Sequence, residues 1–165
     1  MNNVLIIGYG NPVCGDDGVA WHIVQTLLPS LPEGAVHAIH QLTPEWAEAV
    51  SRVEHVIFVD AAVDGAPGEV RCIPISPASK RLGSHEMTPD GLMGMALALY
   101  GECPPAHLVT VTGGSFALSE SLSEKVATAV PEAVRIIFEA IDKENCRGVR
   151  QHPRQFTIES IAELK

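Results

Sequence analysis

The sequence predicts an α/β protein, a three-layer α/β/α sandwich around a mostly parallel sheet of about five strands. Two observations predict this class. Short apolar runs typical of buried strands alternate along the chain with segments whose apolar residues recur at helical spacing. No internal repeat or low-complexity tract interrupts the alternation. We expect one domain over residues 1–145 and a polar C-terminal tail over 146–165.

The first half of the chain predicts two strand–helix units. Their strands and helices are expected over residues 3–8, 18–28, 35–42 and 43–53. The first strand is a continuous apolar run that ends at Gly8, and Pro29 ends the helical pattern that follows it. The second helix opens with Thr43 as its N-cap and Pro44 at its first position, which is a common helix start.

The second half continues the alternation. Strands are expected over residues 55–61, 68–75 and 107–112, and helices over 88–100 and 119–141. The first of these strands is apolar up to Asp60, which indicates burial on both faces with a carboxylate at the carboxyl end. Pro67 and Pro74 favour an edge position for the next strand. Thr88 and Pro89 again form a helix start after a polar loop.

Composition argues against several partners and compartments. Twenty acidic and eleven basic residues give a net charge of −9, which would repel nucleic acid and anionic membrane surfaces. The cysteines form no C-x-x-C pair, so they suggest neither a thiolate zinc site nor a redox motif and fit a reducing compartment. There is no secretory signal pattern, nor a run approaching the ~20 apolar residues that span a bilayer. We expect a cytoplasmic protein.

The loop after the first strand contains a Gly8-x-Gly10 pair, as dinucleotide-binding turns do, but the motif is incomplete. Val13 stands where the third glycine belongs, and two aspartates lie close to where a pyrophosphate would sit. We expect both glycines to serve a tight turn with positive φ, and Asn11 to bond its own backbone there. A nucleotide-binding module stays a minor alternative.

Acidic side chains stand where two predicted parallel strands end. Asp16 and Asp17 close the first loop and Asp60 ends the third strand, and the carboxyl ends of strands in open parallel sheets form the ligand-binding crevice. Asp16 either caps the first helix or supplies a carboxylate for proton transfer. His85, in a polar loop before a helix, can reach the crevice. Asp17, Asp60 and His85 make an oxygen and nitrogen set that suits zinc or nickel.

The other histidines are weaker candidates. His107 opens a predicted strand and stays open between a structural and a functional role. The rest lie on predicted helices, strands or the tail, where surface or structural histidines are the commoner case: His22, His37, His40, His55 and His152.

These motifs resemble the nickel-iron hydrogenase maturation endopeptidases. The matching segments follow the family order and are residues 6–12, 15–19, 59–61 and 84–89, with a weaker match at 122–123. The family removes a short C-terminal extension from the hydrogenase large-subunit precursor after nickel insertion. By position, Asp17, Asp60 and His85 match its metal-contacting residues. Relatives often have glycines where this chain has Ser119 and Ser121.

The resemblance implies an aspartyl-type endopeptidase that works as a monomer on this precursor. It also implies that no metal is resident, because the substrate supplies the nickel, for which cadmium or zinc can substitute in vitro. The nickel would polarise the scissile carbonyl or acidify a bound water, with Asp17 and Asp16 as the catalytic carboxylates. No serine or cysteine nucleophile signature is present. The alternatives are a zinc metallopeptidase with a resident metal and a non-catalytic nickel chaperone.

Overall fold

The predicted fold class is confirmed. The computed structural model describes residues 3–79 and 86–151, with residues 145–151 described as backbone. One five-stranded sheet has the order β2-β1-β3-β5-β4. Its strands are β1 (Val4–Tyr9), β2 (Val36–Ile39), β3 (His55–Ala62), β4 (Val70–Ile75) and β5 (Ala106–Thr112). Of these five strands, only β4 runs antiparallel. It lies at the edge of the sheet beside β5, and this edge position is the one that Pro67 and Pro74 predict.

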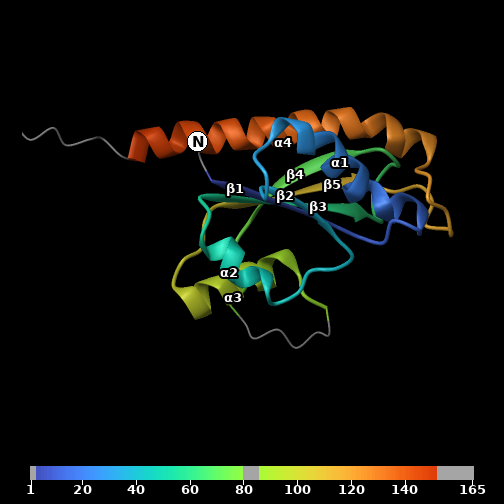
Figure 1. Cartoon of the computed structure of the whole chain (residues 1–165). Coiled ribbons are helices and arrows are strands. Elements are labelled where there is room, and N and C mark those ends of the chain that lie inside the picture. Colours follow the sequence, from blue (N-terminus) through green and yellow to red (C-terminus); the bar gives the residue numbers. More distant parts are fainter. Residues whose placement is uncertain (1–2, 80–85, 152–165) are drawn as a thin grey trace, which may run out of the picture.

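Helices cover both faces of the sheet (Figure 1). They are α1 (Val19–Leu27), α2 (Trp46–Ser51), α3 (Pro89–Tyr100) and α4 (Glu124–Gln151), with short 3₁₀ turns η1 (Gly15–Gly18) and η2 (Leu28–Ser30). The side chains of α1 and α4 share one apolar core with the sheet, and those of α2 and α3 share the other. Ile6 packs into the first core and Ile7 into the second, so β1 is buried on both faces.

The sequence predicts two helix starts with a threonine N-cap, and the structure confirms one of them. In α3, Thr88 is the N-cap and accepts a hydrogen bond from the Gly91 N–H at 3.3 Å, with Pro89 at the first position, as predicted. In α2 the prediction is wrong, because the N-cap is Glu45 and no side chain caps the helix. The Thr43 carbonyl instead accepts from the Trp46 N–H at 3.2 Å, so a tight turn precedes the helix.

The last helix differs from its predicted bounds at both ends. It begins at Glu124 rather than near residue 119, because hydrogen bonds hold the preceding segment in a loop. It continues to Gln151, beyond the predicted end near residue 141 and into the expected tail, since lysine, glutamate and arginine are good helix formers. Within residues 3–79 and 86–151, no helix combines the length and apolar character needed to cross a membrane.

Candidate functional site

A cavity of about 530 Å³ opens at the carboxyl end of the parallel strands. β1 and β3 are parallel neighbours with Gly8 opposite Val59, so the segments that follow them meet at this edge. The loop after β2 and the start of α3 complete the walls. The acidic residues that line the cavity are Asp17, Asp60, Glu86 and Asp90. The structure thus brings together the two carboxylates predicted as metal ligands.

The loop before η1 holds Asp17 in place. The Asn11 N–H donates to Asp17 Oδ2 at 2.6 Å. Gly10 has a φ of 141°, and a Cβ there would lie 2.2 Å from the Asp17 carbonyl oxygen, so only glycine fits this approach. Trp21 Nε1–H fixes the same turn by donating to the Gly10 carbonyl at 2.9 Å. Three residues, Gly10, Asn11 and Trp21, therefore set the position of the Asp17 carboxylate.

Two details of this loop test the sequence interpretation. Asn11 bonds its own backbone as predicted, accepting at Oδ1 from the Val13 N–H at 3.1 Å. Gly8 does not have the predicted positive φ. It is required for another reason, because a Cβ there would lie 2.9 Å from the Val24 side chain and 3.1 Å from the Ala20 carbonyl oxygen of α1. Gly8 thus allows α1 to pack closely on β1.

Asp60 is the second carboxylate of the cavity. Burial raises its pKa to about 6, hydrogen bonds from the Tyr9 hydroxyl and the Ala61 N–H oppose this change, and the charge of Asp17 adds to it. The Ala61 N–H donates to Oδ1 at 2.7 Å. The Tyr9 pKa is raised in turn by burial and by Asp60. A carboxylate that is buried beside a second one, as Asp60 is, would be stabilised by a nearby cation.

Asp16 points elsewhere and does not line the cavity. Its side chain is fully buried, and it caps neither η1 nor α1. Its carboxylate instead accepts four hydrogen bonds of 2.7 to 2.9 Å, donated by Gly114 N, Ser115 N, Ser123 N and Ser123 Oγ. Burial alone would raise the pKa of Asp16, but these bonds together lower it below its usual value. The geometry gives Asp16 a structural role, tying η1 to the loop between β5 and α4.

His85 lies outside the described residues. Glu86, which follows it in the sequence, lines the cavity. A histidine that the sequence interpretation set aside, His40, lines the cavity too. Its ring lies 5.8 Å from that of Trp21 in an edge-on arrangement. Its position was readable in the sequence, because it follows the carboxyl end of β2 much as Asp17 follows that of β1.

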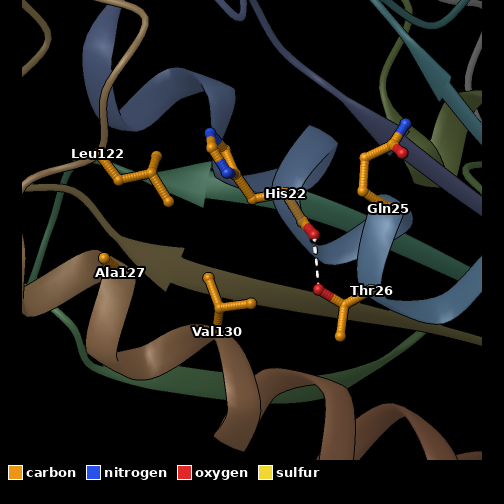
Figure 2. Close-up of a pocket in the computed structure, with 6 residues that line it drawn as sticks. All are labelled: His22, Gln25, Thr26, Leu122, Ala127 and Val130. Carbon is orange, nitrogen blue, oxygen red and sulfur yellow. Dashed lines mark hydrogen bonds between the residues drawn. The ribbon is translucent and has the colours of Figure 1, made fainter.

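A second pocket, of about 360 Å³, lies between α1 and α4 and is shown in Figure 2. His22, Gln25 and Thr26 reach it from α1, and the Thr26 hydroxyl donates to the His22 carbonyl at 2.9 Å. None of the described residues that line it carries a carboxylate, so among these residues it lacks the acid pair of the larger cavity. Among the side chains that the structure describes, no three His, Cys, Asp or Glu come close enough together to hold a metal ion.

The solved structures that this chain resembles include several hydrogenase maturation proteases. The hydrogenase maturating endopeptidase HybD from E. coli matches with a TM-score of 0.69 and 22% identity, over 86% of this chain and 93% of that chain. A hydrogenase 2 maturation peptidase from Thaumarchaeota archaeon SCGC_AB-539-E09 matches with a TM-score of 0.63 and 28% identity, over 84% and 97%. The [NiFe] hydrogenase maturation protease HybD from Thermococcus kodakarensis matches with a TM-score of 0.62 and 20% identity, over 84% and 98%.

No protein-family model and no curated protein matches the chain. The structural matches place the chain in the same fold class as solved structures that are named hydrogenase maturation peptidases. Within that class, the chain is a structural relative of the hydrogenase maturation endopeptidases, and the resemblance predicted from its motifs is confirmed.

Proposed function

We propose that this chain is an endopeptidase that removes the C-terminal extension of a nickel-loaded [NiFe] hydrogenase large-subunit precursor. The observation that carries the proposal is the pairing of Asp17 and Asp60 in one cavity, at the end of a sheet whose fold matches that of named hydrogenase maturation peptidases. In this proposal the substrate supplies the nickel, and the chain cleaves the precursor only when the nickel is bound.

Asp17, Asp60 and His85 are the proposed contacts to the substrate's nickel. Carboxylate and imidazole ligands suit a borderline divalent ion, and an ion beside Asp60 would offset the burial that raises the pKa of this acid. Nickel held there can polarise the scissile carbonyl or acidify a bound water. Of the two carboxylates predicted to be catalytic, Asp17 lines the cavity and Asp16 does not, so we assign the direct role to Asp17.

Cleavage of purified precursor tests the proposal. The precursor is prepared with and without nickel and incubated with wild type, Asp17→Asn, Asp60→Asn or His85→Ala, and its mass is followed over time. We expect wild type to shorten only the nickel-loaded form, and each variant to be slower by on the order of 100-fold, because each removes one contact to the metal.

Asp64→Asn is the matched control. Asp64 lies just after β3, four residues beyond Asp60, but its side chain is 78% exposed, pairs with Arg71 at 3.0 Å and does not line the cavity. The Asp64→Asn variant should cleave the nickel-loaded precursor at the rate of wild type. Equal cleavage by all variants would reject the site. Stoichiometric zinc in the purified protein would favour a resident-metal peptidase, and tight nickel binding by the chain alone without cleavage would favour a chaperone.

A further inference from the structure

Tyr9 stands beside Asp60 at the carboxyl end of the sheet. β1 and β3 are parallel neighbours with Ile7 opposite Phe58, and Tyr9 and Asp60 lie two residues further along their strands. Because side chains alternate between the faces of a strand, Tyr9 shares the face of Ile7, and Asp60 shares that of Phe58. Ile7 and Phe58 belong to the core that the sheet forms with α2 and α3. Tyr9 and Asp60 therefore lie side by side on this face, and both line the cavity.

A hydrogen bond joins the two side chains, because the Tyr9 hydroxyl donates to the Asp60 carboxylate. A tyrosine hydroxyl is protonated at neutral pH, so it can act as this donor. The Tyr9 ring is half-buried and packs against the core beside α2 and α3, which fixes the place of the hydroxyl. The Ala61 N–H donates to Asp60 Oδ1 at 2.7 Å. The Asp60 carboxylate is thus held both from its own strand and from the neighbouring strand.

The two carboxylates proposed to contact nickel are held by different means. Asp17 accepts from the backbone N–H of Asn11, so its position depends on the turn after β1. Asp60 depends in part on a side chain, the hydroxyl of Tyr9. Carboxylates that bind metals are themselves oriented by hydrogen bonds, and removal of such a partner typically lowers metal affinity or activity by about 10- to 100-fold. The Tyr9 hydroxyl is the side-chain group placed to orient Asp60.

We propose that Tyr9 is a positioning residue, which holds the Asp60 carboxylate in the orientation that contacts the substrate's nickel. The inference rests on the proposed function, in which Asp60 is one of the nickel contacts. Tyr9 acts through Asp60 and contacts neither the metal nor the scissile bond. The alternative is that the Tyr9 ring only fills the core, with a hydroxyl that has found a partner, as buried tyrosines usually do. In that case the hydroxyl can be removed without any effect on cleavage.

Tyr9→Phe in steady-state cleavage of the nickel-loaded precursor is the first test. We expect kcat to fall about tenfold with KM close to that of wild type, because the ring and the shape of the cavity stay while Asp60 loses its orienting partner. Tyr100→Phe is the matched control and should keep the kcat of wild type, since Tyr100 is 47% exposed at the end of α3 and does not line the cavity.

A double variant tests whether Tyr9 acts through Asp60. In Asp60→Ala the hydroxyl has no carboxylate to orient, so the addition of Tyr9→Phe should lower kcat no further. A merely structural role of Tyr9 predicts instead that the two losses multiply. A further tenfold loss in the double variant, like a kcat of Tyr9→Phe equal to that of wild type, overturns the inference.

Crystal structures of the chain alone separate this inference from the proposed function. Wild type should show one orientation of the Asp60 carboxylate, with the Tyr9 hydroxyl within hydrogen-bonding distance of it. Tyr9→Phe should show the carboxylate rotated away or in two orientations. This result supports the positioning role even if wild type cleaves no precursor, an outcome that would reject only the proposed function. A wild-type structure without the Tyr9–Asp60 contact overturns the inference, as does a carboxylate that keeps its orientation in Tyr9→Phe.

Discussion

Replacement of Asp16 tests whether this acid is structural or catalytic. Asp16 Oδ2 accepts from Gly114 N, Ser115 N and Ser123 Oγ, and Oδ1 accepts from Ser123 N. In Asp16→Asn, the oxygen can keep the place of Oδ2, but the amide NH₂ then faces the Ser123 N–H, which is also a donor. One hydrogen bond is lost, a buried N–H is left unsatisfied, and three bonds lose the assistance of a charge.

The magnitude follows from these losses. A hydrogen bond to a charged group contributes about 1.5–3 kcal/mol, and an unsatisfied buried donor costs about 1–3 kcal/mol. Removal of a fully buried charge relieves its desolvation and offsets part of this sum. We expect Asp16→Asn to lower the free energy of unfolding by about 3 kcal/mol. Ser123→Ala, which removes a single donor, should lower it by about 1.5 kcal/mol.

Urea denaturation followed by circular dichroism measures these changes, with Asp64→Asn as the surface control, which should stay within about 0.5 kcal/mol of wild type. The structural role predicts that Asp16→Asn loses stability, and that any folded fraction still cleaves the precursor. A variant as stable as wild type but unable to cleave would refute this reasoning and return Asp16 to the proton-transfer role.

Three further predictions concern stability. Gly10→Ala should lower the free energy of unfolding by more than about 3 kcal/mol, because the new Cβ would overlap the Asp17 carbonyl oxygen. Gly34→Ala should lower it by only about 1–2 kcal/mol, because Gly34 has a φ of 79° but no atom lies within 4 Å of the new Cβ. Urea titrations of both variants measure the two losses. Trp21→Phe removes the donor to the Gly10 carbonyl and should cost about 1 kcal/mol in the same assay. Burial, then the charge of His107, lowers the pKa of His55 from 6.5 to about 4, so protonation opposes folding; stability should fall by up to about 3 kcal/mol as pH drops from 6.5 to 4. Melting curves across this range should show a weaker pH dependence in His55→Gln, and an unchanged slope would contradict the assignment.

The sequence predicted the architecture because the apolar runs are unambiguous. Four consecutive aliphatic residues in β1 leave few alternatives to a strand buried on both faces, and an open parallel sheet of such strands needs helices on both of its faces. The convergence of Asp17 and Asp60 followed from the same rule, since both stand where parallel strands end. The apolar pattern of the sequence thus predicts well the features that depend on strand direction and strand burial.

The functions of Asp16 and Gly8 could not be read in this way. The partners of Asp16 are some 100 residues away along the chain, and no local pattern announces a hydrogen bond over that separation. Gly8 is required by the approach of α1, which is a tertiary contact, whereas a Gly-x-Gly pair by itself suggests a turn. His40, by contrast, could have been found, because it directly follows the carboxyl end of β2 and lines the cavity.

The central claim is that Asp17, Asp60 and His85, distant in the chain, share one cavity and hold nickel there. Anomalous X-ray scattering at the nickel absorption edge, from crystals of the chain in complex with the nickel-loaded precursor, tests it most directly. We predict one peak in the cavity within bonding distance of the Asp17 and Asp60 carboxylates and the His85 ring. Nickel bound at another site, such as the His55–His107 pair at the opposite end of the sheet, with the cavity empty, would contradict the account.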